Sequence, residues 1–560
     1  MNSLLWVAII VSWLIIGYKV YGKFIERRLV EPDDTKPTPA HSNYDGGDYS
    51  PARIPLLFGH HFSSIAGAGP IVGPLLGVMY FGWLLSSLWI AFGSVFIGAV
   101  HDYLALMTSV RNNGRSISQT AQQTLGTLSK SIFATFLWLA LVLVVAVFAV
   151  ITAKTFIAQP EIVIPTFGLI LVAILFGYTI YRLKWPILIG TVLALSLLAL
   201  LLYIGENVPV ILPETVVGMS ALNFWFCILM LYCVFASTIP VWILLQPRDY
   251  ISSWLLYIGM GLGFLGLIVL HPHMEAPAVV SFSSKEGPMW PMMFVIIACG
   301  AVSGFHSLVS GGTSSKQLDR ERQGLVIGYG AMITEAILAT LVIAVAAGAL
   351  IWDPSAVKSE FGYQYLMGAG GGPIVAFSHG FGKIVSSLPV LTLVAGMYIG
   401  MLMLNAFVIT TLDTATRLAR FIFVESLGEK FKLFGNKYVV TVITVLVAAF
   451  LGTSGGYKTI WPVFGAANQL VAALALIVIS AYLVGIKKPR IYTVIPAFFM
   501  IATTIGALVY KMIGFVQKGN IVLAILSILL IGLGLFVIYE ARAVLLFMKD
   551  GRNPAGDKSL

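Results

Sequence analysis

The residues best suited to chemistry in this sequence are histidines that stand beside serine and glycine in two short runs. The run HHFSSIAGAGP begins at His60, and the residues of interest in it are His61, Ser63, Ser64, Gly67 and Gly69. The run GFHSLVSGGTSSK begins at Gly304, and its residues of interest are His306, Ser307, Ser310, Gly311, Gly312 and Thr313. Because imidazole and hydroxyl groups hydrogen-bond carboxylates, and imidazole also exchanges protons near neutral pH, the two runs predict a binding site for a small carboxylate.

A second set of residues is ionisable yet lies in or beside apolar stretches; its members are His101, Asp102, Lys316, Glu335 and Asp413. A charged group at the centre of a bilayer costs about 2.5–3.5 kcal/mol, so each such residue predicts a function in proton coupling or gating. Glu335 is interpreted either as a proton carrier or as a carboxyl held neutral by a neighbouring hydroxyl or carbonyl. Asp102 is interpreted as fixing a histidine tautomer, or as pairing with Lys316 or Arg417 in a gate.

Asp413 stands among the four threonines Thr410, Thr411, Thr414 and Thr416. Hydroxyl and carboxylate oxygens suit sodium, and a hydrogen-bonded cluster at a helix end is the alternative. The histidines with Asp102 also suggest a transition-metal site, but neighbours such as His60 and His61 point about 100° apart on a helix. We therefore predict neither a metal nor a cofactor.

These residues belong to a chain whose composition excludes a water-soluble fold. Of 560 residues, 58% are hydrophobic and only 10% are charged, against roughly 25% charged in soluble domains. The sequence predicts an all-α polytopic membrane protein with about fifteen transmembrane helices, because a span needs about 20 apolar residues. The expected spans begin near residues 3, 55, 83, 131, 166, 186, 219, 252, 289, 324, 388, 438, 459, 491 and 520.

The net charge of +10 reports membrane orientation rather than nucleic-acid binding, because lysine and arginine lie at the ends of the apolar runs. With the N-terminus outside and the C-terminus in the cytoplasm, all but seven of the 34 basic residues fall on the cytoplasmic side. Residues 370–387 are apolar but rich in glycine, and we interpret them as a re-entrant or interfacial piece. The three cysteines, Cys227, Cys233 and Cys299, form no CxxC motif and no disulfide framework.

The chain is expected to divide into two transporter halves with additional segments. The expected parts are an extra N-terminal transmembrane helix (1–22), a cytoplasmic loop (23–54), a first half (55–270), an outside loop (271–288), a second half (289–484), and C-terminal helices with a cytoplasmic tail (485–560).

Each half is expected to contain one broken helix, at 60–80 and at 298–315. Pro70 and Pro74 each remove a helical donor, and irregular backbone at membrane depth is tolerated only where it is buried in protein or lines a cavity. Because the two breaks are seven spans apart, their helices run in opposite directions, which is typical of an inverted repeat around a midplane site. The half-helix N-termini near Gly67 and Gly311 would then present amides to a carboxylate. Close helix packing is the alternative use of these glycines.

Four motifs carry a resemblance to a known family: HHFSSIAGAGPIVGP from His60, VHDY from Val100, GFHSLVSGGTSSKQLDRE from Gly304 and TTLDTATRLARF from Thr410. The chain resembles the carbon starvation protein A family of bacterial peptide and pyruvate transporters over nearly its whole length. The resemblance implies a LeuT-like inverted repeat of five helices plus extra helices; a seven-plus-seven inverted repeat is the alternative. It also implies location in the bacterial cytoplasmic (inner) membrane.

The function predicted from these features is secondary active import of a peptide or pyruvate by alternating access, with a proton as coupling ion. A sodium symporter and a channel or sensor without accumulation are the alternatives. An enzyme is not expected, because no HExxH motif occurs and no nucleophile has an evident base partner; no GxxxxGK[ST] loop for ATP occurs either. The expected partners are the small-molecule substrate, the coupling ion and the lipid bilayer.

Overall fold

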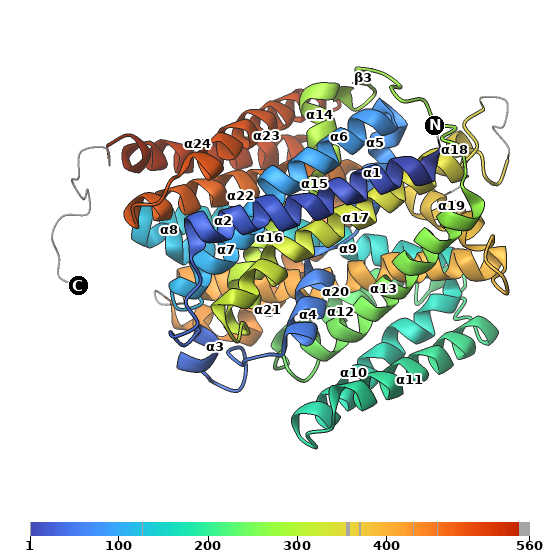
Figure 1. Cartoon of the computed structure of the whole chain (residues 1–560), viewed down its shortest axis with the longest axis horizontal. Coiled ribbons are helices and arrows are strands. Elements are labelled where there is room, and N and C mark those ends of the chain that lie inside the picture. Colours follow the sequence, from blue (N-terminus) through green and yellow to red (C-terminus); the bar gives the residue numbers. More distant parts are fainter. Residues whose placement is uncertain are drawn as a thin grey trace.

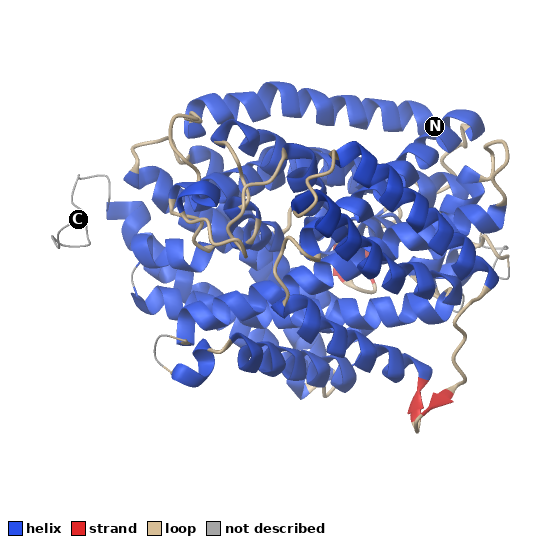
Figure 2. Cartoon of the chain, turned by 90° about the horizontal axis from the view of Figure 1, so that it is seen from below, coloured by secondary structure: helices blue, strands red, loops and turns tan. Residues whose placement is uncertain are grey.

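A computed structural model describes residues 2–125, 127–353, 359–368, 371–428, 431–455 and 457–547, which leaves the expected cytoplasmic tail beyond residue 547 outside the described residues. The long helices run side by side along the longest axis of the molecule (Figure 1). Helices dominate the fold, and the strands form small hairpins (Figure 2). The strands are β1 (Thr215–Val216), β2 (Met219–Ser220), β3 (Ser283–Ser284) and β4 (Gly287–Pro288).

Within the described residues, twelve helical segments are long and apolar enough to cross a membrane, or thirteen if one bent helix pair counts as a span. The single-helix spans are α9 (Thr127–Ala158), α10 (Val163–Tyr181), α11 (Ile187–Asn207), α12 (Ala221–Thr238), α13 (Leu245–Leu270), α20 (Leu393–Leu427), α22 (Tyr457–Gly485), α23 (Ile491–Gln517) and α24 (Ile521–Phe547). The other three spans contain wider helical turns; they are Ser3–Val30 with α1 (Ser3–Ile16) and α2 (Lys23–Ile25), Trp83–Arg111 with α6 (Trp83–Gly93) and α7 (Ala99–Arg111), and Glu321–Ala349 with α17 (Ala331–Ala344). The prediction of a polytopic helical membrane protein is confirmed.

The helices outside these spans are α3 (Pro39–Ser42), α4 (Ile54–Ile65), α5 (Gly69–Phe81), α8 (Ile117–Leu125), α14 (Met289–Ile296), α15 (Ala298–Ala301), α16 (Gly304–Gly312), α18 (Tyr363–Met367), α19 (Pro373–Val385) and α21 (Lys437–Gly455). They explain why twelve spans are counted among the described residues where fifteen were expected. The expected spans at 55 and 289 are each broken into shorter helices, and the apolar stretch of α21 whose side chains are described, Lys437–Thr453, is shorter than the twelve spans.

The re-entrant or interfacial piece expected at 370–387 begins at a residue outside the described ranges and then forms α19. This helix has thirteen residues, too few to cross a bilayer, and most of its side chains are buried. It packs against α20, since the Cβ that a side chain at Gly382 would carry lies 2.5 Å from Met397. The observed helix therefore stays within the bundle.

Residues 31–53, most of the cytoplasmic loop expected at 23–54, lie against the segment that follows α16. The Ser50 and Ala52 amides donate to the carbonyls of Lys316 (3.1 Å) and Gln317 (2.9 Å). The Thr38 hydroxyl donates to the Leu318 carbonyl at 2.5 Å. These contacts hold residues 31–53 against the segment that follows α16.

Candidate functional site

The first broken helix is the pair α4 and α5, which meet at residues 66–68 with a bend of 44°. The break frees carbonyls at the end of α4, and two threonines of α20 satisfy them: Thr410 donates to the Ser63 carbonyl at 2.7 Å and Thr411 to the Ser64 carbonyl at 3.1 Å. Hydroxyl donors thus stabilise the irregular backbone inside the bundle. This accounts for two of the four threonines around Asp413.

The second broken helix consists of α14, α15 and α16, and its backbone is extended at Val302 and Ser303. Asn468 of α22 spans this break: its Oδ1 accepts from the Phe305 amide at 2.8 Å and its Nδ2 donates to the Ser303 hydroxyl at 3.0 Å. A Cβ on Gly304 would lie 2.1 Å from the Asn468 carbonyl oxygen, so only glycine fits at that position. Both interruptions expected from the sequence are present, and each has its own polar partner.

The two broken helices lie against each other. A Cβ added at Gly69, at the start of α5, would lie 2.3 Å from the Cys299 sulfur of α15. A Cβ added at Gly73 would lie 2.8 Å from the Ile296 carbonyl oxygen. Glycine is therefore needed at Gly69 and Gly73 for close approach, which is the packing use that the sequence left open.

Beside these breaks lies a cluster that we call the histidine cluster; it consists of His101, Asp102, His306 and Glu335. The two Asp102 oxygens lie 2.7 Å from His101 Nδ1 and 2.6 Å from His306 Nδ1. His306 Nε2 lies 3.3 Å from a Glu335 oxygen, within ion-pair range but without hydrogen-bond alignment. All four side chains are fully buried. A chain of proton-exchanging groups therefore runs from α7 through α16 to α17.

Several polar atoms of the histidine cluster have no hydrogen-bond partner among the described residues. They are the Nε2 atoms of His101 and His306 and both carboxyl oxygens of Glu335. His61 lies on the adjoining α4 with its Nδ1 2.7 Å from the Ser314 hydroxyl, and its Nε2 is also unpaired. Buried polar groups are rarely left unpaired, so these atoms are candidate contacts for a proton, water or substrate.

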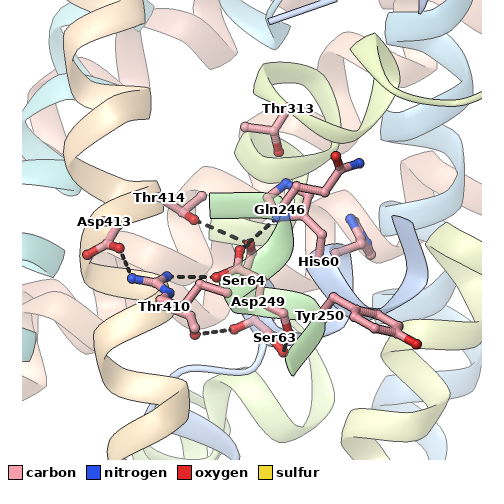
Figure 3. A network of polar contacts seen from close by, with 12 residues as sticks. His60, Ser63, Ser64, Gln246, Asp249, Tyr250, Thr313, Thr410, Asp413 and Thr414 are labelled. Atoms are coloured by element: carbon pink, nitrogen blue, oxygen red, sulfur yellow. Dashed lines mark hydrogen bonds and ion pairs between the residues drawn. The ribbon is translucent and has the colours of Figure 1, made fainter. Parts of the chain in front are cut away.

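A second buried network, which we call the arginine cluster, joins α12, α13, α20 and α4. Figure 3 shows the part of it around Asp249 and Asp413. Its members are Arg248, Asp249, Asp413, Tyr232, His60 and Ser64. The Arg248 guanidinium donates to Asp249 at 2.7 Å and forms an ion pair with Asp413. The Tyr232 hydroxyl donates to Asp413 at 2.6 Å. The second Asp249 oxygen lies 2.7 Å from His60 Nδ1 and accepts from the Ser64 hydroxyl at 3.0 Å.

The contacts of the two clusters bear on the interpretations of two carboxylates. Asp413, interpreted as part of a sodium site or of a helix-end cluster of hydroxyls, pairs with a buried guanidinium because α13 brings Arg248 to it. Asp102, interpreted as fixing a histidine tautomer or as pairing with Lys316 or Arg417, lies between two histidines, the contact that the first interpretation requires. Lys316 instead lies over the Phe421 ring at 4.4 Å, and Arg417 pairs with Asp48 at 3.1 Å.

The remaining predicted residues of the second run are buried with different surroundings. Ser307 and Thr313 donate to carbonyls of their own helix, and the Ser310 hydroxyl has no partner among the described residues. A Cβ on Gly311 would have its nearest neighbour at 3.6 Å, whereas one on Gly312 would lie 2.0 Å from Leu418. Gly312 therefore makes a close packing contact, and Gly311 lies near the C-terminal end of α16 rather than at the half-helix N-terminus expected there.

Sequence reasoning missed Arg248, Asp249, Tyr232 and Asn468. The expected span began near residue 252, so the run QPRDY from Gln246 was left in a loop, although α13 begins at Leu245. A signal was present, because a basic and an acidic residue stood side by side where an apolar run begins. Among the described residues, no group of three or more histidine, cysteine, aspartate or glutamate side chains is arranged to hold a metal ion.

The chain is similar to known proteins in both sequence and structure. The model of the family "Carbon starvation protein CstA" matches residues 2–356 and 354–507. The chain is 31% identical over 600 residues to the pyruvate/proton symporter BtsT of Escherichia coli, covering 91% of this chain and 82% of that protein. It is 34% identical over 550 residues to the peptide transporter CstA of Mycobacterium tuberculosis (85% and 70% covered), and 29% identical over 586 residues to that of Bacillus subtilis (97% and 96% covered).

Among solved structures, the chain is similar to the crystal structure of the Eremococcus coleocola manganese transporter in complex with an aromatic bis-isothiourea substituted compound. The TM-score is 0.50 at 13% identity, with 90% of this chain and 99% of that chain covered. This likeness concerns the fold alone.

Proposed function

The chain belongs to the carbon starvation protein CstA family, and from this premise we propose that it is a proton-coupled secondary transporter that imports a small carboxylate, pyruvate or a short peptide. Family membership makes it a multi-pass membrane transporter rather than an enzyme. The proposal adds the substrate class, the coupling ion and the direction. It also places the protein in the bacterial inner membrane, with the N-terminus outside and the C-terminus in the cytoplasm.

The observation that carries the proposal is the histidine cluster at the broken helices. Asp102, His306 and Glu335 are fully buried, and His306 lies 2.6 Å from Asp102 and 3.3 Å from Glu335. Such groups inside a membrane mark proton relays in pumps and transporters. In the proposed mechanism a proton binds to this cluster. The substrate carboxylate accepts hydrogen bonds from imidazole groups or from backbone amides at the two breaks.

Two further features support binding at the membrane midplane. Each proposed half, 55–270 and 289–484, contributes one broken helix, and the two breaks lie against each other. Every member of the histidine cluster is buried, so the described conformation keeps this site closed to both aqueous sides. Access then requires one half to move against the other, which is the alternating access of secondary transporters. Whether the repeat is LeuT-like or seven-plus-seven stays a prediction.

Uptake by proteoliposomes tests the proposal. We expect labelled pyruvate or a labelled dipeptide to accumulate above its outside concentration when an inward proton gradient is imposed, and not when only a sodium gradient is imposed. Accumulation driven by a sodium gradient would show that sodium, and not a proton, is the coupling ion. Equilibration without accumulation under either gradient would identify a channel and overturn the proposal.

A further inference from the structure

A cavity of about 250 Å³ lies beside the C-terminal part of α20, away from the histidine cluster. Three basic side chains line it, together with one carboxylate and the end of α12; the lining includes Arg417, Arg420, Lys437, Asp48, Thr238 and Ile239. Three cations thus face a single carboxylate. A cavity this size is smaller than the usual pockets for drug-sized ligands, so it suits a molecule of a few heavy atoms.

Arg420 is the unusual member of this lining. Its side chain is 4% exposed, its Nε has no hydrogen-bond partner among the described residues, and no carboxylate there forms an ion pair with it. The guanidinium carbon lies 4.6 Å from the centre of the Phe421 ring, which covers one face of the group. Buried charges are normally paired, because desolvating an unpaired charge is costly. An anion in the cavity would supply the missing partner of Arg420.

Arg417, one turn earlier on the same helix, already has an anionic partner. Its Nη1 lies 3.1 Å from Asp48 of the 31–53 loop, and its Nη2 donates to the carbonyls of Ala236 and Ile239. The nearby carboxylate of Glu425 is engaged elsewhere, since it accepts from the Ser116 hydroxyl at 2.6 Å. The cavity therefore contains one guanidinium that already binds a carboxylate and a second that lacks one.

We propose that this cavity binds a small carboxylate anion on the guanidinium of Arg420, beside the Arg417–Asp48 pair. Guanidinium groups bind carboxylates through charge-assisted hydrogen bonds in a planar fork, and Asp48 shows that this wall accepts a carboxylate. Because Asp48 places a negative charge next to the site, it competes with the bound anion. The site is separate from the histidine cluster and does not depend on the proposed transport mechanism.

A local fluorescent reporter tests this site in the purified full-length protein. Val424 lines the cavity, so Val424→Cys can be labelled in a Cys227→Ser background, where the remaining cysteines, Cys233 and Cys299, are buried. Titration with sodium pyruvate in detergent is expected to change the fluorescence saturably. Arg420→Gln should raise the half-saturating concentration roughly tenfold or more, as expected for losing a hydrogen bond to a charged group. Arg320→Gln, at an exposed arginine, is the matched control and should leave it unchanged.

A second variant guards against misfolding as an explanation. Asp48→Asn removes the competing carboxylate and should lower the half-saturating concentration for pyruvate several-fold, a gain that damaged protein does not give. An equal half-saturation in Arg420→Gln and the parent, or no saturable response to pyruvate, would overturn the proposal. A response only to inorganic phosphate would show that the site binds free phosphate and not a carboxylate. A response only to phosphatidylglycerol vesicles, compared with phosphatidylcholine, would identify a lipid headgroup instead.

Discussion

The histidine cluster and the arginine cluster are both buried, both contain two carboxylates, and both contact a broken helix or its neighbours, yet their chemistry differs. The histidine cluster joins two imidazoles, a kind of group that exchanges protons near neutral pH, to two carboxyl groups. The arginine cluster is organised around a guanidinium that stays charged, with a carboxylate on each side. One network is suited to change its charge during a cycle, and the other is suited to hold α12, α13 and α20 together.

The largest expected effect breaks the arginine cluster. Arg248→Leu leaves Asp249 and Asp413 buried without their cation, and removing one partner of a buried ion pair costs about 3–5 kcal/mol. We expect a large drop in the thermal unfolding midpoint of the purified protein. The triple variant with Asp249→Asn and Asp413→Asn should recover part of the loss; no recovery would show that the charges are not what Arg248 stabilises.

The matching change in the histidine cluster should act on transport instead of folding. Asp102→Asn keeps the size of the side chain but removes the carboxylate between His101 and His306. We expect substrate to reach only equal concentrations on the two sides in proteoliposomes under a proton gradient, with the unfolding midpoint nearly unchanged. A variant that unfolds like Arg248→Leu would place Asp102 with the structural network and would remove the contrast between the clusters.

A paired glycine substitution sharpens the comparison at the second broken helix. Gly312→Ala places a Cβ 2.0 Å from Leu418 and should cost about 1–3 kcal/mol through overpacking, whereas Gly311→Ala meets nothing closer than 3.6 Å. Thermal unfolding of the two variants under the same conditions checks this. Equal loss in both variants would contradict the close packing assigned to Gly312.

The smallest effect is expected far from both clusters, at Glu31. A hydrogen bond and ion pair with Lys488, 2.7 Å away, hold the pKa of the Glu31 carboxyl below its ordinary value. A lowered pKa stabilises the fold above the ordinary carboxyl range, and this contribution is lost as the pH falls. Lys488→Gln should therefore lower the unfolding midpoint slightly at neutral pH and not at all in strong acid. A difference in unfolding midpoint that grows as the pH falls would contradict the predicted direction.

Hydropathy predicted most of the fold, because a span of about 20 apolar residues is a local property. Proline and glycine likewise predicted both breaks, since they remove or loosen backbone hydrogen bonds locally. The arginine cluster escaped prediction because its ion pairs and hydrogen bonds join side chains from four helices, and a hydropathy window counts Arg248 and Asp249 only as charges. The close contact at Gly312 rather than Gly311 was unpredictable for a similar reason: one residue turns a helix position by about 100°, and only packing decides which position meets Leu418.

Sequence reasoning was most successful for the ionisable residues that lie in apolar stretches. His306, Asp102 and Glu335 were each identified separately, and the structure brings them into one chain of contacts. Their grouping was not predictable from spacing, because they come from α16, α7 and α17. The division of the chain into two halves and the assignment of the substrate contacts stay predictions.

The most direct test of the central claim is proton movement in proteoliposomes loaded with a pH-sensitive dye, without an imposed proton gradient, after addition of pyruvate or a dipeptide outside. We expect acidification of the interior with the unchanged protein and none with Glu335→Gln, while Glu335→Gln still exchanges labelled for unlabelled substrate. Acidification that persists in Glu335→Gln would contradict the assignment of proton coupling to the histidine cluster.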